Sequence, residues 1–266
     1  MRRIISRQSG FTLIEIAIAL VIITVLLGYT VAMFPVQQEL KQYRDVDQEM
    51  EQIIDDLIGY AQVNGRLPCA DADNDGLEDW AGVGNDCTSW FGNVPARTIG
   101  YDGNYSAGGV LIDPWGSAYR YQVSAIDSGV PADTFGDFIT PNGIRNAGIA
   151  QFDQFTVGAT PPDLQVCNVQ PAAHSAATPT DELVCDANTD VVTNVAAVVL
   201  SLGKDKDNVI ANTSDIQSEN LDNSVTDTVF IASTRNDSAG NEYDDVVKWI
   251  STSKLFGRMI AAEQLP

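Results

Sequence analysis

The sequence predicts an α+β fold in which one long N-terminal helix precedes a β-rich region. Residues 11–34 form an apolar run that carries a single charge, and the apolar residues after this run recur at intervals of three and four, which is typical of a helix. From residue 65 onward, short apolar or alternating runs are separated by Gly, Pro, Asp and Asn, which is typical of strands and loops.

The composition is that of a folded, acidic protein. The chain has 266 residues, 44% of them hydrophobic, so it can bury a sizeable core and is not disordered. It carries 15 Lys and Arg against 36 Asp and Glu, a net charge of −21. Nucleic-acid binding depends on basic patches, so we expect no nucleic-acid partner, whereas cation binding or simple solubility fits this charge.

The apolar run from Phe11 to Phe34 is long enough to span a membrane as a helix, because about 20 apolar residues cross a hydrocarbon core of roughly 30 Å. Arg2, Arg3 and Arg7 precede the run and would remain cytoplasmic, which places the rest of the chain outside. The single charge in the run is Glu15, and a carboxylate in lipid needs a partner.

Two general explanations of this segment compete with a more specific one. It can be an ordinary secretory signal peptide cleaved after Thr30-Val31-Ala32, so that the mature chain starts at Met33. It can also be a plain membrane anchor in which Glu15 lies close to the lipid headgroups.

The specific explanation is a resemblance. Gly10-Phe11-Thr12-Leu13-Ile14-Glu15, behind a short basic leader, resembles the cleavage and methylation motif of type IV prepilins and of the pseudopilins of type II secretion. The resemblance implies that prepilin peptidase cuts after Gly10 and methylates the new amino group of Phe11. It also implies that Glu15 pairs with the N-terminal amine of a neighbouring subunit, which offsets the cost of burying each charge in a filament.

The same resemblance implies the organisation of the chain. The expected parts are a leader peptide (1–10), a transmembrane half-helix (11–34), an amphipathic half-helix (35–64) and a periplasmic head (65–266). The helix is expected to pack on a head built from an antiparallel β-sheet with long, disulfide-stapled loops.

The function that the resemblance implies is a structural subunit of a type IV pilus or of a type II secretion pseudopilus, and not an enzyme. The chain would cross the inner membrane once, with its N-terminus in the cytoplasm and its head in the periplasm, in a filament that can reach the cell surface. The expected partners are prepilin peptidase, the inner membrane and other pilin or pseudopilin subunits.

The helix is expected to continue beyond the apolar run. Pro35 can kink it without ending it, and a helix over residues 12–63 would be roughly 78 Å long at 1.5 Å per residue. Asn64-Gly65 suits a helix C-cap. One face of the second half carries apolar residues at steps of three and four: Val36, Leu40, Tyr43, Val46, Met50, Ile53, Leu57 and Tyr60.

An acidic stretch directly after the helix begins like a calcium loop. Asp71, Asp73 and Asp75 alternate and are followed by a glycine, as in EF-hand loops, and Asp79 occupies the ninth position. The twelfth position is Gly82, where an EF-hand needs a bidentate Glu. The sequence therefore leaves two interpretations open, a calcium site or a solvated acidic loop stapled by a disulfide.

The cysteine count predicts two disulfides, since an even number of cysteines in an exported chain pairs. The four are Cys69, Cys87, Cys167 and Cys185, and sequential pairing is the simplest of three connectivities that remain open. The only histidine, His174, lies in a Pro-, Ala- and Ser-rich stretch, where we expect it to be exposed. Zinc and a Ser-His-Asp triad therefore have little support.

A second resemblance concerns Asp113-Pro114-Trp115-Gly116, which is similar to a turn of the major pseudopilins. Pro and Gly make the turn, and Trp115 is expected to pack on the long helix. Tyr119, Tyr121 and Val123 follow with the alternation of a strand and are expected to point to one face.

The rest of the head is expected to be a loop-rich insertion over residues 124–190, followed by regular elements. Ser253 is a candidate N-cap for the last helix. The expected elements are a strand at Phe152–Val157, a buried strand or short helix at Val191–Leu202, strands at Thr228–Ala232 and Asp245–Ile250, and a helix at Lys254–Gln264.

Two further expectations depend on resemblance. Pseudopilins bind calcium in a loop at about the place of Asp205, Asp207 and Asp222, which makes these three residues candidate ligands by analogy. Residues 244–259 are similar to the C-terminal segment of a group of pilin-like proteins, which favours one continuous head.

Two other functions remain as alternatives to the structural subunit. The first is a filament-tip minor pilin whose head binds a ligand or acts as an adhesin. The second is a secreted periplasmic hydrolase with an ordinary signal peptide, although no G-x-S-x-G motif is present.

Overall fold

The computed structural model describes most of the chain. It covers residues 10–81, 86–127, 129, 136–152, 159, 161–169, 185, 188–204, 220, 228–236, 238 and 242–265, and for residues 30–34 it describes only the helical backbone. In chain order the elements are α1 (Leu13–Asn64), β1 (Phe91–Asn93), α2 (Ala96–Ile99), β2 (Arg120–Val123), α3 (Gly143–Ala147), η1 (Ile149–Gln151), β3 (Leu164–Cys167), β4 (Asp190–Ser201), β5 (Val229–Ile231), β6 (Val246–Ser251) and α4 (Thr252–Ala261).

The chain divides into two compact units, Met1–Asp45 and Val46–Pro266, and helix α1 contributes to both. The helix has the length expected from the sequence, and Pro35 lies inside it. It ends where Gly65 adopts a positive φ of 66° and donates its N–H to the carbonyl of Ala61, as in a glycine C-cap.

The expected apolar stripe of α1 is buried only within the second unit. Val46, Met50, Ile53 and Leu57 are fully buried, and Ile54, Ile58 and Ala61 widen this buried face. Val36 and Leu40 continue the stripe into the first unit, where they are more than half exposed. The periodicity therefore identified the correct face of the helix. The apolar residues of this face are fully buried only from residue 46 onward.

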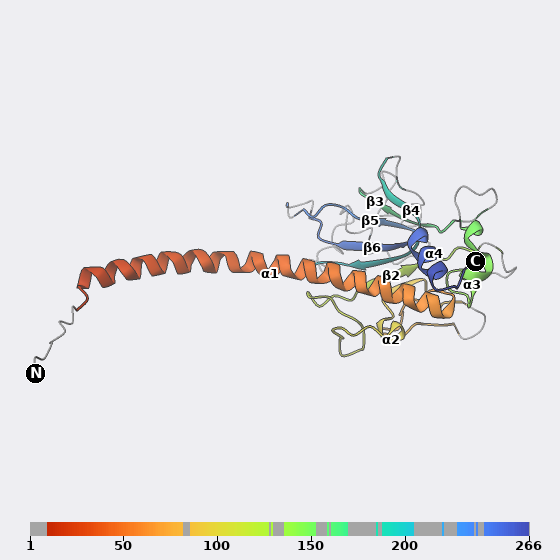
Figure 1. Cartoon of the computed structure of the whole chain (residues 1–266), viewed down its shortest axis with the longest axis horizontal. Coiled ribbons are helices and arrows are strands. Elements are labelled where there is room, and N and C mark those ends of the chain that lie inside the picture. The colour runs from red at the N-terminus through yellow and green to blue at the C-terminus, as the bar shows by residue number, and fades with distance from the viewer. Residues whose placement is uncertain are drawn as a thin grey trace, which may run out of the picture. The chain divides into compact units, whose positions relative to one another are not determined.

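Strand β4 lies in the middle of a six-stranded sheet (Figure 1). It pairs antiparallel with β2, β3 and β6, with Val123 opposite Ala197, Leu164 opposite Val195, and Ile250 also opposite Ala197. The path of strands is β1-β2-β4-β3-β5, and β3 and β5 run parallel. The sheet is thus mixed, so the expectation of a purely antiparallel sheet was wrong.

Strands β3 and β5 can run parallel because a long stretch of chain separates them in the sequence. A parallel neighbour needs a long connection, and the chain provides one through β4 and the residues that follow it. This pairing depends on partners more than 60 residues apart and leaves no local pattern in the sequence.

The long apolar run at β4 is explained by burial on both faces of the sheet. Ala197 and Val199 belong to the main core, which also contains the buried residues of α1, whereas Val198 and Leu200 belong to a second cluster with Leu164 and Phe230. Because side chains alternate between faces, a strand covered on both sides is apolar throughout. Of the two predicted structures for residues 191–202, the buried strand is the one that forms.

The turn at Asp113-Pro114-Trp115-Gly116 is held by the Asp113 carboxylate. Its Oδ1 accepts the N–H groups of Trp115 and Ser117 at 3.0 and 2.8 Å, and its Oδ2 accepts the Ser201 hydroxyl at 2.7 Å. Trp115 is half-buried at the edge of the main core. Tyr119, Tyr121 and Val123 are fully buried as expected, and the Tyr119 hydroxyl donates to Glu49 of α1.

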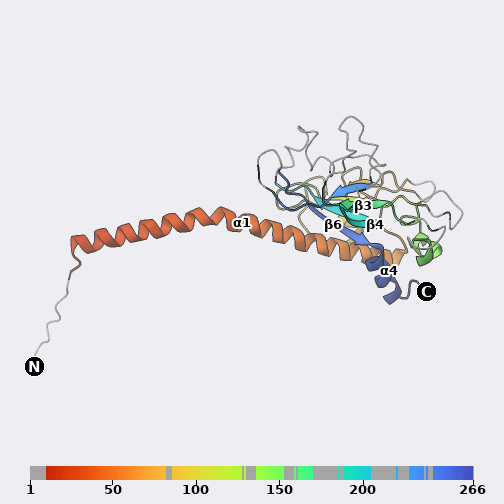
Figure 2. The same ribbon diagram turned by 90° about the horizontal axis from the view of Figure 1, so that it is seen from above.

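Helix α4 lies beside the last turns of α1 (Figure 2). Lys254 and Arg258 approach Asp55 of α1 at 3.2 and 3.5 Å, and the Gln62 amide donates to the carbonyl of Arg258 at 2.8 Å. Strand β6 adds Lys248, whose ammonium lies 2.6 Å from Asp47.

The N-cap of α4 differs from the predicted one. Ser251 has extended backbone angles and accepts the N–H of Lys254 with its side chain, so Ser251 and not Ser253 caps this helix. Both serines precede the same apolar face, and the end of β6 decides between them because β6 places Ser251 in the extended conformation that an N-cap needs.

Several expectations lie outside the described residues. These are Gly82, His174, Asp205, Asp207, Asp222 and all of the expected strand at 152–157 except Phe152. Phe152 itself follows η1 and packs against Phe138 and Phe256 in the main core.

Candidate functional site

The N-terminal candidate site begins with an exposed, non-helical segment. Gly10 and Phe11 precede α1, and the side chain of Phe11 is 78% exposed. A peptide bond between these residues therefore lies outside the hydrogen-bonded helix. A protease that requires an extended chain can reach it without unwinding α1.

Thr12 and Glu15 form the start of the helix. The Glu15 N–H donates to the Thr12 carbonyl at 3.1 Å and to the Thr12 hydroxyl at 3.3 Å. The order Thr-x-x-Glu is that of a capping box, and an acid in the first turn interacts favourably with the helix dipole. Among the described residues no ion pair involves Glu15, so in the single chain its carboxylate has no cationic partner there.

The helix that follows presents apolar side chains to its surroundings on every face. Between Leu13 and Tyr29 the large apolar side chains are exposed, from 49% for Ile23 to 88% for Leu13. Within the described part of the chain, no helix is both long enough and apolar enough to cross a membrane. An apolar surface this continuous on a single chain indicates contact with another apolar surface.

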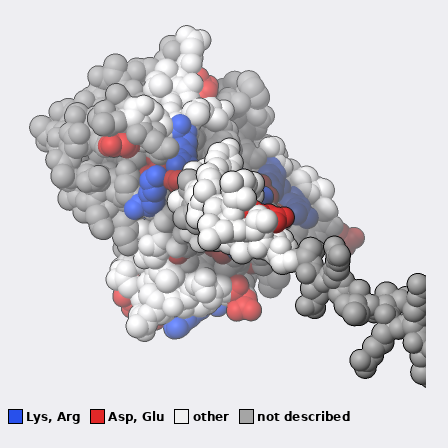
Figure 3. Space-filling model, turned by 90° about the vertical axis from the view of Figure 1, so that its left-hand side faces the viewer, with Lys and Arg blue, Asp and Glu red and all other residues white. Residues whose placement is uncertain are grey.

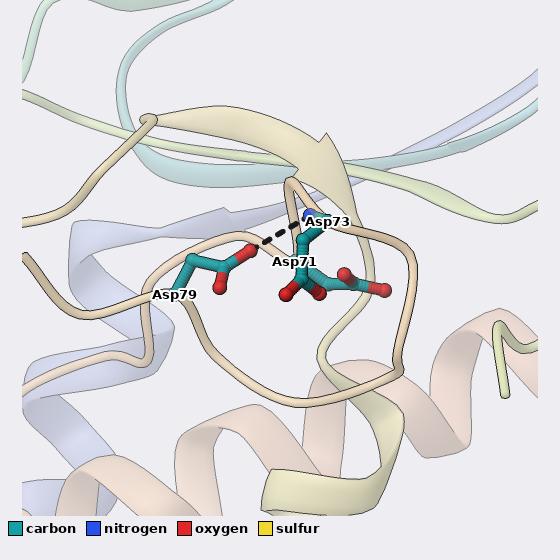
Figure 4. Close-up of side chains that lie close together, drawn as sticks. All are labelled: Asp71, Asp73 and Asp79. Atoms are coloured by element: carbon teal, nitrogen blue, oxygen red, sulfur yellow. Dashed lines mark hydrogen bonds between the residues drawn. The ribbon is translucent and has the colours of Figure 1, made fainter.

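The second candidate site is the acidic loop, residues 71–79. Asp71, Asp73 and Asp79 each bring one carboxylate oxygen into a group whose members lie within 4.8 Å of one another (Figure 4). Asp75 is not part of this group, and its carboxylate accepts the N–H of Leu77 at 2.7 Å. Asn74 and Gly76 both have positive φ within this loop.

The carboxylates of the acidic loop already accept hydrogen bonds from its backbone. Asp71 accepts the N–H groups of Asn74, Asp75 and Gly76 at 2.7 to 3.2 Å, and Asp79 accepts those of Ala72 and Asp73 at 2.6 and 2.9 Å. Asp71 is buried, and burial raises the pKa of its carboxyl, while the N–H donors act in the opposite direction. The loop is thus held by its own amides, and three oxygens remain close enough to share a cation.

A buried ion pair anchors the acidic loop to the end of α1. Both carboxylate oxygens of Glu78 are bound by the Arg66 guanidinium, at 2.7 and 2.8 Å. Glu78 also accepts the Tyr60 hydroxyl and the Cys69 N–H. Burial alone would raise the pKa of the Glu78 carboxyl, but the hydrogen bonds and charge of Arg66, with these two donors, outweigh burial and hold the pKa below its ordinary value.

The two disulfides join Cys69 to Cys87 and Cys167 to Cys185, which is the sequential pairing. The first encloses the acidic loop, and the second connects the end of β3 to the residues before β4. Charges of both signs are interspersed on the face shown in Figure 3, so among the described residues no field of a single sign covers that face.

Comparison with known proteins identifies the N-terminal site. Residues 5–31 match the family model described as the prokaryotic N-terminal methylation motif, which is consistent with a type IV pilin-like or pseudopilin-like protein. No curated protein and no solved structure matches the chain.

Proposed function

We propose that this chain is a structural subunit of a filament of the type IV pilus or type II secretion pseudopilus class. The observation that carries the proposal is the methylation motif at residues 5–31, which includes the first turns of a helix whose apolar side chains are exposed. The motif implies a membrane-associated precursor, processing by prepilin peptidase and assembly with other pilin subunits. None of these roles requires catalysis by the chain itself.

In the proposed precursor, residues 1–10 are the leader and residues 11–34 of α1 reside in the inner membrane. Residues 35–64 complete the helix, and residues 65–266 form the periplasmic head. After cleavage, the same apolar surface that faced lipid packs against the helices of neighbouring subunits. This exchange of one apolar environment for another explains why the segment is retained and not discarded.

The role of Glu15 in this proposal is electrostatic. Cleavage after Gly10 leaves a cationic amine on Phe11, four residues before the carboxylate of Glu15. Pairing the amine of one subunit with Glu15 of another stabilises only the correct register, because an unpaired charge in an apolar interior is costly. Glu15→Ala is therefore expected to be processed normally but to lower the yield of filaments by about tenfold or more.

The decisive experiment is mass spectrometry of the mature N-terminus in protein isolated from its native membrane. Methylated Phe11 as the first residue supports the filament subunit. A start at Met33 would instead support a secreted protein with an ordinary signal peptide, such as the hydrolase alternative. Immunogold labelling then separates a subunit that is spread along the filament from a minor pilin at the filament tip.

The matched control for Glu15→Ala is Glu15→Asp, which keeps the charge and shortens the side chain by one methylene. Recovery of filaments with Glu15→Asp attributes the defect to charge. Normal filaments from Glu15→Ala would contradict the pairing.

For the acidic loop we propose calcium binding by Asp71, Asp73 and Asp79. The proximity of their oxygens and the preference of calcium for carboxylate ligands support it. Asp75, the fourth candidate ligand, lies in the same loop and accepts the N–H of Leu77.

A further inference from the structure

Three Asn-x-Ser/Thr tripeptides occur in the chain: Asn104-Tyr105-Ser106, Asn212-Thr213-Ser214 and Asn236-Asp237-Ser238. This tripeptide, with any residue except Pro in the middle, is the acceptor for N-linked glycosylation in exported proteins. The tripeptide alone is common, so accessibility and the hydrogen bonding of the asparagine amide have to separate acceptors from chance occurrences.

Asn104 has the features of an acceptor. Its side chain is exposed, and within the described residues its amide group makes no hydrogen bond. Its backbone is nevertheless well held, because its carbonyl accepts the N–H of Ile112 at 2.8 Å and the next residue, Tyr105, forms a bridge with Leu111. The amide nitrogen is therefore presented to solvent from an ordered loop.

The neighbours of Asn104 maintain this presentation. Tyr105 is half-buried, donates its hydroxyl to the Tyr101 carbonyl and lies under the Arg97 guanidinium. A Cβ on Gly103 would come within 2.7 Å of the side chains of Tyr101 and Leu111, so a larger residue would force these side chains to move. The loop is thus anchored on both sides of Asn104, while Asp102 and Asn104 remain exposed.

The other two tripeptides do not show these features. Asn236 pairs through its backbone with Tyr243 in both directions, and its side-chain oxygen accepts the N–H of Ser238 at 3.0 Å. The side-chain oxygen of Asn236 is therefore already bound within a local turn, and its backbone is held on both sides. Asn212 lies outside the described residues.

We propose that Asn104 is an N-glycosylation site of the head. The proposal depends on the proposed function, because the head must leave the cytoplasm to meet a glycosyl donor at the outer side of the inner membrane. The donor class is an oligosaccharide linked through diphosphate to a polyprenyl lipid.

The transfer is a substitution at the anomeric carbon of the first sugar. The Nδ2 atom of Asn104 forms a bond to this carbon and loses one proton to a base of the transferase. The bond between the anomeric carbon and the diphosphate oxygen breaks, and the lipid diphosphate leaves with the electron pair. No oxidant or reductant is involved.

The test is peptide mapping of the full chain isolated from its native membrane. Trypsin releases residues 98–120 as one peptide, since Arg97 and Arg120 flank a stretch without Lys or Arg, and Asn104 is its only asparagine. We expect this peptide to exceed its unmodified mass by the mass of a glycan, and electron-transfer fragmentation to place that mass on Asn104. An unmodified peptide 98–120 from the native cell would overturn the proposal.

Three variants identify the acceptor chemistry. Asn104→Gln removes no hydrogen bond of the described chain and should lose the added mass while leaving thermal unfolding of a glycan-free sample unchanged. Ser106→Thr keeps the tripeptide and should retain the glycan, whereas Ser106→Ala should lose it. Ser106→Ala also removes an acceptor for the Val110 N–H. If the Ser106→Ala variant folds poorly, Ser106→Thr and Asn104→Gln are the informative pair.

Two results would contradict the site specifically. Added mass that persists in Asn104→Gln would assign the modification to another residue, such as the Ser106 hydroxyl. Added mass on a peptide containing Asn236 but not on peptide 98–120 would reverse the order of accessibility argued above. The same digest reports the mature N-terminus, so methyl-Phe11 with an unmodified Asn104 rejects this inference alone, and an N-terminus at Met33 rejects the filament subunit alone.

Discussion

Arg66 holds one of the most enclosed charge contacts among the described residues. Its side chain is 11% exposed and that of its partner Glu78 is 17% exposed. The guanidinium also lies 4.2 Å from the centre of the Trp80 ring and 5.2 Å from that of Tyr60. This contact joins the residue after α1, the end of the acidic loop and two aromatic rings, so its loss should affect the head as a whole.

We predict that Arg66→Met destabilises the head by about 3–5 kcal/mol, because it leaves the buried Glu78 carboxylate without its cation. The free energy of unfolding in urea measures this loss. In the double variant Arg66→Met/Glu78→Leu no buried charge remains, and part of the stability should return. A double variant no more stable than Arg66→Met would show that packing on the rings, and not the ion pair, dominates.

The same pair predicts a pH dependence. The folded-state pKa of Glu78 lies below its ordinary value of 4.5, so the folded state binds this proton less readily than the unfolded state. The stabilisation is therefore fully present above the unfolded pKa and is lost as the pH falls through the folded pKa. Between pH 7 and pH 3 the native chain should lose more unfolding free energy than Glu78→Gln, and equal losses would contradict the assignment.

At the scale of elements, the C-terminal elements pack on the second half of α1. Helix α4 and strand β6 place Lys248, Lys254 and Arg258 against acidic residues on the polar face of α1. These pairs are partly exposed, so each contributes little alone. The apolar side of α4, with Leu255, Phe256 and Met259 buried, contributes more to this packing.

The N-cap of α4 can be tested with two neighbouring serines. Ser251→Ala removes the side-chain acceptor for the Lys254 N–H and should lower the free energy of unfolding by about 1 kcal/mol. Ser253→Ala is the matched control and should change it by less than about 0.5 kcal/mol. If Ser253→Ala were the more destabilising of the two, the cap would be at Ser253 after all.

Helix α1 offers a second matched pair, since its apolar stripe contains one leucine that is buried and one that is exposed. Leu57 is fully buried, and Leu57→Ala should destabilise the head by about 2–5 kcal/mol. Leu40 is 55% exposed, so Leu40→Ala should leave unfolding within about 0.5 kcal/mol of the native value but reduce filament yield. Unfolding in detergent and filament quantification separate the two effects, and normal filaments from Leu40→Ala would show that this residue is not in an assembly contact.

At the scale of the whole molecule, the described part of an acidic chain with a net charge of −21 contains three buried apolar clusters and two disulfides. Each disulfide closes a loop of similar size, with a sequence separation of 18 residues. A disulfide that closes a loop of this length stabilises the folded state by about 3 kcal/mol, because it restricts the unfolded chain.

We predict that calcium at ten times its dissociation constant stabilises the native chain by about 1.4 kcal/mol, because it binds the folded acidic loop and not the unfolded chain. The thermal midpoint should rise on addition of calcium and fall again with a chelator. Asp73→Asn should abolish the response, whereas Asp102→Asn, an exposed acid outside the group, should retain it. A midpoint unaffected by calcium would leave the carboxylates as acceptors for the loop's own N–H groups only.

Features that depend on neighbours in the chain were predictable. Helix α1 follows from its periodicity and its glycine cap, and the strands at residues 229–231 and 246–251 follow from short runs of Val, Ile, Phe and Trp. The motif around Gly10 is equally local, and the family model matches it from residue 5 to residue 31. Strand β3 was missed because its four residues stand alone within a loop-rich stretch.

Features that depend on distant partners were not predictable. The parallel pairing of Val166 with Phe230, the position of β4 between β6 and the other strands, and the burial of Val46 but not Leu40 all require knowledge of which segments meet. In the acidic loop, the Asp-x-Asp-x-Asp pattern suggested four ligands, and only the folded loop shows that oxygens of Asp71, Asp73 and Asp79 lie within 4.8 Å of one another.

Amino-acid order was thus sufficient for the processing motif, the long helix and the number of disulfides, since each depends on spacing along a few turns of chain. The fold of the head, its mixed sheet and the composition of the acidic group emerged only when strands and loops far apart in the sequence competed for the same buried surface and the same backbone hydrogen bonds.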